Sequence, residues 1–213
     1  MKTYRIYFIR NGLTEDNLTG RVIGRTDVPL IPESEQMLTA MGEKYIYPAA
    51  DAYFSAPLAR CHRTVELLFP DASIKTVDDL NECDLGDFEG KTAAELADDD
   101  AYRNWVGGDM DTAPPNGEST SAFMRRVCNA FNRIVRQMMS DGLEDAVICA
   151  TGGVISAILA VYGLPQRKMS DWECLGGKGY CAIIDPSIWM RGGMFVVAGE
   201  YPFLHVEVEY NRL

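Results

Sequence analysis

The chain has 213 residues, with 47% hydrophobic and 24% charged residues, values ordinary for one soluble globular domain spanning residues 1–213. Its net charge of −11 argues against binding to nucleic acid or to an anionic membrane surface. No apolar run reaches the roughly 18 residues that cross a bilayer. The N-terminus also lacks an apolar signal core, so we expect a cytoplasmic protein.

Metal and disulfide chemistry has little support in the sequence. The six cysteines form no CxxC pair, and the only histidines are His62 and His205. Cys128 and Cys149 lie in apolar surroundings typical of reduced core thiols. We therefore expect neither a metal nor a cofactor. A phosphate ligand would need a local cluster of arginines that works against the acidic charge of the whole chain.

The first predicted element is a strand at residues 4–9, rich in aromatic and β-branched side chains. It stops at Arg10-Asn11-Gly12, where Gly12 allows a backbone turn that a residue with a Cβ would resist. In open α/β sheets, ligands bind beyond the carboxyl ends of the strands. An arginine at such an end can direct two donors onto a phosphate or a carboxylate.

The rest of the chain alternates between strand and helix patterns. Strands are predicted at 52–55, 74–77 and 146–150, and short strands with turns over 179–208. Helices are predicted at 32–45, from about residue 57, at 92–106 with a solvated acidic face at 98–100, after an N-cap at Ser119, and over 156–162. This alternation predicts a three-layer α/β/α sandwich with a mostly parallel sheet.

The motifs in the connecting loops resemble, in order, those of the histidine phosphatase superfamily, the family of the phosphoglycerate mutases. The matching positions are Arg10, Gly12, Thr14 and Asn17; then Gly24, Asp27, Pro29 and Leu30; then Ser55, Leu58 and Arg60; then Leu80, Glu82, Gly86, Phe88, Glu89 and Gly90; then Gly117, Glu118 and Ser119; and then Gly152 and Gly153. The short stretch between Gly90 and Gly117 lacks the Tyr/Arg-rich insertion of the mutases, so the chain looks nearer to the small broad-specificity phosphatases.

The resemblance implies a role for each matching polar residue. It implies phosphate binding by Arg10, Asn17, Arg60 and Gly152, a pocket wall containing Thr14 and Gly24, and a proton donor to the leaving oxygen at Glu82. It also implies a phosphoglycerate mutase-like fold and a site that needs no metal. For Arg60 there is a physical argument as well, because a cation in the first turn of a helix is electrostatically disfavoured unless an anion lies nearby.

The chain departs from the family at both of its catalytic histidines. Asn11 stands at the position of the nucleophile, and Thr151 stands at the position of the second histidine. The lone pair of an amide nitrogen is delocalised and cannot accept a phosphoryl group, and a threonine hydroxyl carries no positive charge. We therefore expect little or no phosphatase activity, and a non-catalytic binder of a phosphate ester or of inorganic phosphate.

Two alternatives stay open at this stage. The chain could be a phosphomonoester phosphatase, either an inactivated variant of an active enzyme or one with another nucleophile such as His62 or Cys149. It could also be a scaffold with a vestigial pocket that associates with other proteins. We expect His62 to be an exposed helical residue and His205 to be a structural histidine in a strand. Neither the ligand nor the oligomeric state follows from the sequence.

Overall fold

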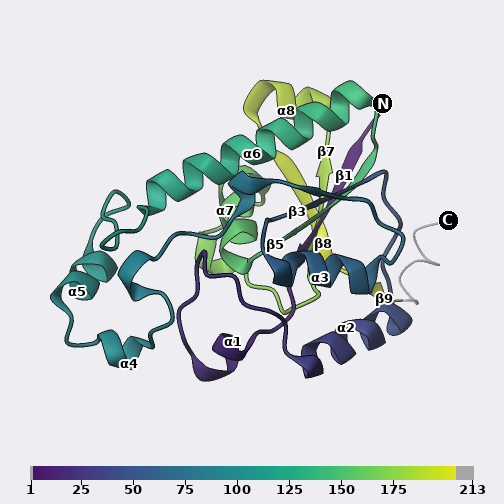
Figure 1. The fold of residues 1–213 in the computed structure, drawn as a ribbon. Coiled ribbons are helices and arrows are strands. Elements are labelled where there is room, and N and C mark those ends of the chain that lie inside the picture. The colour runs from purple at the N-terminus through teal and green to yellow at the C-terminus, as the bar shows by residue number, and fades with distance from the viewer. Residues whose placement is uncertain (1, 205–213) are drawn as a thin grey trace.

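The computed structural model describes residues 2–204, and it contains a mixed, mostly parallel seven-stranded sheet (Figure 1). The strands lie in the order β4-β3-β5-β1-β7-β8-β6. β7 is antiparallel to both of its neighbours, and the other neighbouring pairs are parallel. The strand bounds are β1 Tyr4–Arg10, β3 Ala52–Ser55, β4 Ile74–Thr76, β5 Asp145–Ala150, β6 Gly163–Leu164, β7 Gly179–Ile184 and β8 Phe195–Tyr201, with β2 Tyr45–Ile46 and β9 Phe203–Leu204 forming a separate pair.

Helices cover both faces of the sheet, as the sequence predicted. The α-helices are α1 Glu15–Thr19, α2 Pro32–Lys44, α3 Ala59–Leu68, α4 Ala93–Leu96, α5 Asp100–Gly107, α6 Thr120–Asp141, α7 Gly152–Tyr162 and α8 Pro186–Gly192, and the short 3-10 turns are Asp78–Leu80, Gly86–Phe88 and Met169–Asp171. Figure 1 places α6, α7 and α8 on one side of the sheet and α2 and α3 on the other. None of the helices in residues 2–204 has both the length and the apolar character that spanning a membrane requires.

The core follows from the alternation of side chains along β1. Phe8 faces α6, where its ring lies 5.8 Å from the ring of Phe131. Tyr7 points to the opposite face and stacks on Tyr201 at 4.8 Å. The helix predicted after Ser119 is α6, and its apolar stripe is buried: Phe123, Val127, Ala130, Phe131, Ile134, Val135 and Met138. Apolar burial on both faces holds the carboxyl ends of β1 and β5 in fixed positions.

Two predictions of secondary structure were wrong. The segment 92–106 forms two helices rather than one, because the Asp99 carboxylate caps α5 by accepting hydrogen bonds from the backbone of Ala101 and Tyr102. The segment 179–208 includes a helix as well as strands. The Asp185 carboxylate caps α8 by accepting from the backbone of Ser187. His205 lies outside the described residues.

Candidate functional site

The site begins where two neighbouring parallel strands end. β1 and β5 are paired up to Arg10 and Ala150, and the Asn11 backbone N–H donates to the Ala150 carbonyl at 3.1 Å. The chain then continues into Asn11 on one strand and Thr151 on the other. A cavity of about 140 Å³ opens at this edge of the sheet. Its walls are Arg10, Asn11, Thr14, Asn17, Ile23, Arg60, Glu82, Thr151, Gly152 and Gly153.

Arg60 is the most deeply buried charge of this cavity, with only 4% of its surface exposed. Its guanidinium donates to the carbonyls of Thr26 at 2.8 Å and Gly24 at 3.0 Å. No carboxylate of residues 2–204 lies within ion-pair distance of it. Two carbonyls satisfy part of its hydrogen-bonding capacity but supply no countercharge, so the cavity offers a buried cation to an anion.

Arg10 supplies a second guanidinium from the end of β1. It donates to the Cys174 carbonyl at 2.6 Å, and it lies against Gly152, where an added Cβ would be only 3.4 Å from Arg10 Nε. Like Arg60, it has no carboxylate within ion-pair distance among the described residues. The cavity therefore carries two arginines and one acid, Glu82, in a chain whose net charge is −11.

Thr151 and the two glycines after it form the N-terminus of α7. Thr151 is the N-cap residue, yet its side chain accepts no hydrogen bond from the helix. Its Oγ1 is buried and has no hydrogen-bond partner within residues 2–204, and the residue is 5% exposed. A buried hydroxyl without a partner is costly, and the start of a helix carries a partial positive charge. Both features favour an electronegative ligand atom in this cavity.

Asn11, which lines the cavity, and Gly12 directly follow β1. The Asn11 amide nitrogen donates to the Gly12 carbonyl at 2.7 Å. We predicted that Gly12 allows an unusual turn, and this reason was wrong, because its φ is not among the positive values. A Cβ at position 12 would instead lie 2.5 Å from Ser34 Oγ and 2.9 Å from Leu38 Cδ1. Crowding from α2, rather than backbone conformation, explains the glycine.

Thr14 and Asn17 line the cavity together at the start of α1. Asn17 Oδ1 accepts from the Thr14 backbone at 3.0 Å and from the Thr14 hydroxyl at 3.2 Å. Gly24, which we predicted in the pocket wall, does not line the cavity, but its carbonyl accepts a hydrogen bond from Arg60. The Gly24 backbone N–H in turn donates to the Glu89 carboxylate at 2.9 Å, and that of Arg25 does so at 3.0 Å. Glu89 therefore holds the loop in which Arg60 is anchored.

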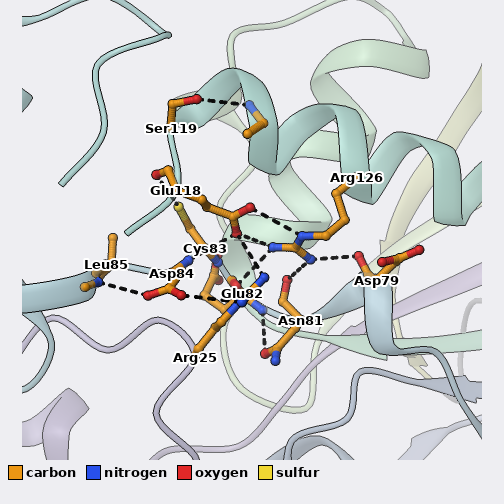
Figure 2. A network of polar contacts seen from close by, with 12 residues as sticks. Arg25, Asp79, Asn81, Glu82, Cys83, Asp84, Leu85, Glu118, Ser119 and Arg126 are labelled. Atoms are coloured by element: carbon orange, nitrogen blue, oxygen red, sulfur yellow. Dashed lines mark hydrogen bonds and ion pairs between the residues drawn. The ribbon is translucent and has the colours of Figure 1, made fainter. Parts of the chain in front are cut away.

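Glu82 lines the cavity from a loop that a second, partly buried arginine holds. Its carboxylate packs on Gly153, where a Cβ would lie 2.6 Å from Glu82 Oε1. Figure 2 shows the Arg126 guanidinium of α6 between the Glu118 carboxylate and this loop. Arg126 donates to the carbonyls of Asp79 and Asn81 at 2.9 Å each, and to the Glu82 carbonyl at 3.3 Å. The sequence motifs included Glu118 but gave no sign of Arg126.

The two alternative nucleophiles considered from the sequence do not line the cavity. His62 is partly buried rather than exposed, and its Nε2 lies 3.2 Å from Thr76 Oγ1. Cys149 is fully buried in β5, and burial raises the pKa of its thiol well above the usual value. A thiol held neutral in the core is a poor nucleophile. Within residues 2–204, no three His, Cys, Asp or Glu side chains gather as a metal site would require.

Comparison with known proteins identifies the family. The model of the histidine phosphatase superfamily (branch 1) matches residues 6–186. Adenosylcobalamin/alpha-ribazole phosphatase of Escherichia coli is 26% identical, covering 85% of this chain and 89% of its own. Sedoheptulose 1,7-bisphosphatase of Saccharomyces cerevisiae is 30% identical, covering 79% and 71%. The crystal structure of phosphoglycerate mutase from Bacillus anthracis is 18% identical, covers 93% and 92%, and superposes with a TM-score of 0.75.

The chain belongs to the histidine phosphatase superfamily, branch 1, and is related to phosphatases and mutases. Its fold is that of the phosphoglycerate mutases. Members of this family bind phosphorylated small molecules.

Proposed function

We propose that this chain binds a small phosphorylated molecule or inorganic phosphate in the cavity at the end of β1 and β5, and that it hydrolyses phosphate esters very slowly or not at all. The observation that carries the proposal is Arg60, whose buried guanidinium has two carbonyl partners and no countercharge among the described residues. A dianionic phosphoryl group would supply that charge and accept the remaining donors.

Three further groups support binding of a phosphoryl group. Arg10 adds a second guanidinium, and the backbone N–H groups at the start of α7 add donors at the positive end of an eleven-residue helix. The Thr151 hydroxyl lacks a partner in the described part of the chain and can donate to a phosphate oxygen. The cavity volume of about 140 Å³ is large enough for a phosphoryl group.

The expectation of slow chemistry rests on Asn11 and Thr151. No imidazole, thiol or carboxylate stands at position 11 after β1, and among residues 2–204 the only carboxylate lining the cavity is that of Glu82. Loss of an activated nucleophile and of a positively charged donor removes several kcal/mol of transition-state stabilisation. Because the segment between Gly90 and Gly117 is short, we also place the chain nearer to the broad-specificity phosphatases than to the mutases.

The test is titration calorimetry with inorganic phosphate, combined with a steady-state phosphatase assay. The parent should bind phosphate and show negligible turnover of phenyl phosphate. Asn11→His alone should give little activity, and Asn11→His with Thr151→His should give measurable turnover, because the two imidazoles act as a unit. Clear turnover by the parent would instead favour a phosphatase with another nucleophile. Absence of phosphate binding would favour a scaffold with a vestigial pocket.

A further inference from the structure

One sequence motif contributes no residue to the wall of the phosphate cavity: Gly24, Asp27, Pro29 and Leu30. The loop at residues 24–27 nevertheless contacts Arg60 twice over. The carbonyls of Gly24 and Thr26 accept from the Arg60 guanidinium. The Asp27 carboxylate accepts from the backbone N–H of Ala59, at 2.9 Å to Oδ1 and 3.1 Å to Oδ2. Ala59 and Arg60 are the first two residues of α3, so one short loop holds both the guanidinium and the start of its helix.

The start of α3 depends on Asp27 because the helix has no capping side chain of its own. Leu58 occupies the N-cap position, and its side chain is buried in the core, with 2% of its surface exposed. A leucine has no oxygen that could accept from the helix, and the first N–H groups of a helix have no partners within it. The Asp27 carboxylate supplies that acceptor from outside the helix, and its negative charge lies at the positive end of α3.

The 24–27 loop is itself fixed at both of its ends. At its start, the Glu89 carboxylate accepts from the Gly24 backbone N–H at 2.9 Å. Beyond its end, Leu30 is buried, and the Ile31 backbone N–H donates to the Leu13 carbonyl at 3.1 Å. Because the loop is fixed, loss of its contact with the start of α3 would displace the first turn of the helix rather than the loop.

The charge of Asp27 does not neutralise Arg60. Among residues 2–204, no carboxylate lies within ion-pair distance of the Arg60 guanidinium. A negative charge near a phosphate site would by itself weaken phosphate binding, whereas a carboxylate that positions an arginine would strengthen it. The two possible roles of Asp27 therefore predict opposite effects when its carboxylate is removed.

We propose that Asp27 is a positioning residue for phosphate binding. Its carboxylate holds the first turn of α3 on the 24–27 loop and thereby sets the position of the Arg60 guanidinium in the cavity. This inference rests on the proposed function, because it concerns the same phosphate site. Asp27 acts through Arg60 and lies outside the cavity wall, so it need not contact the ligand.

The test measures the affinity of the full chain for inorganic phosphate by calorimetry. Asp27→Ala should lower the affinity about fivefold, because the helix start loses its acceptor and Arg60 loses its position. Asp27→Asn keeps an acceptor oxygen at the same place, so its affinity should stay within about twofold of that of the parent. Asp27→Glu keeps the charge but displaces the oxygens by one methylene, so its affinity should fall about threefold.

A double variant tests whether Asp27 acts through Arg60. In an Arg60→Met background, Asp27→Ala should cause no further loss of phosphate affinity, because the group that it positions is already absent. Asp185→Ala is the matched control, since it removes an exposed carboxylate that caps α8, a helix that does not line the cavity. It should lower Tm about as much as Asp27→Ala does and leave the phosphate affinity unchanged.

Three outcomes would overturn the inference while leaving the proposed function intact. They are phosphate binding by Asp27→Ala that is as tight as that of the parent or tighter, an equal loss in Asp185→Ala, and an undiminished further loss in the Arg60→Met background. If Asp27→Ala does not fold, the other two variants decide, because binding by Asp27→Glu as tight as that by Asp27→Asn would also overturn the inference. Failure of the parent to bind phosphate would overturn the proposed function as well.

Discussion

Two arginines of this protein, Arg60 fully buried and Arg126 partly buried, both bind backbone carbonyls but differ in one further partner. Arg60 and Arg126 each hold a loop by donating to backbone carbonyls, those of Gly24 and Thr26 for Arg60 and those of the 79–82 loop for Arg126. Arg126 also has the Glu118 carboxylate, whereas Arg60 has no carboxylate within ion-pair distance among residues 2–204. The charge of Arg126 is neutralised within the fold, whereas that of Arg60 has no countercharge among the described residues.

The comparison distinguishes an arginine that stabilises the fold from an arginine whose charge can bind a ligand. A buried ion pair whose two members are both present is tolerated, but a single buried charge is unfavourable. A protein retains such a charge where a ligand needs it, and unfavourable local features are expected at functional sites. Substitutions at the two arginines should therefore have different effects. Substitution of Arg126 should chiefly lower the free energy of unfolding, and substitution of Arg60 should chiefly weaken phosphate binding.

The largest effect is expected from Arg126→Met. It leaves the Glu118 carboxylate without its cation and frees the carbonyls of the loop that carries Glu82. Because the pair is only partly buried, the free energy of unfolding should fall by about 2–3 kcal/mol, measured by urea denaturation. The control is Arg133→Met, which breaks the exposed pair with Asp79 and should cost less than about 1 kcal/mol. Equal losses for the two variants would contradict a scaffold role specific to Arg126.

Arg60→Met should act mainly on binding. Phosphate affinity should fall by at least about tenfold, because a charge-assisted donor pair is lost. Without phosphate, the free energy of unfolding should fall by less than about 2 kcal/mol, since only two carbonyls lose a partner. Thermal unfolding with and without phosphate measures both effects, because a ligand that binds the folded state raises Tm. If phosphate raises the Tm of Arg60→Met as much as that of the parent, Arg60 does not contribute to phosphate binding.

Glu89→Gln should weaken binding indirectly. The Glu89 carboxylate accepts from the backbone of Gly24, Arg25 and Leu85, and Gly24 provides a carbonyl for Arg60. A neutral amide keeps one acceptor oxygen and loses the charge, so phosphate affinity should fall about threefold. Glu95→Gln, at an exposed carboxylate paired with Arg21, is the control and should leave the affinity unchanged. Calorimetry distinguishes the two variants.

The smallest effect on stability is expected from Thr151→Val. The Thr151 hydroxyl caps nothing and has no partner among residues 2–204, so removing it should not lower the free energy of unfolding and should raise it by up to about 1 kcal/mol. Ser119→Ala removes a hydroxyl that does cap a helix, α6, and should cost about 1 kcal/mol. A comparable loss for Thr151→Val would mean that its hydroxyl has a partner in solution.

The sequence predicted the parts of the site that follow strand ends. Arg10 ends β1, Asn11 and Thr151 directly follow β1 and β5, and adjacent parallel strands bring their ends together. Arg126 could not be predicted in the same way. It contacts carbonyls 44 to 47 residues away in the chain. Every residue has a backbone carbonyl, so the sequence does not indicate which carbonyls will accept from an arginine. The N-cap at Asp99 was missed for a related reason, because it lies within a run of acids that we interpreted as a solvated face.

The hydrogen bond from Asn11 to the Ala150 carbonyl has a consequence for protein engineering. Main-chain atoms alone fix the spacing between positions 11 and 151, and neither side chain at these positions supports a helix or a strand. The two positions can therefore be varied together as a small combinatorial library in an unchanged frame. Pairs of cysteine, histidine or aspartate at 11 and 151 would sample different reactive groups beside the same two arginines. The chain thus provides a host in which new chemistry can be selected without first redesigning the fold.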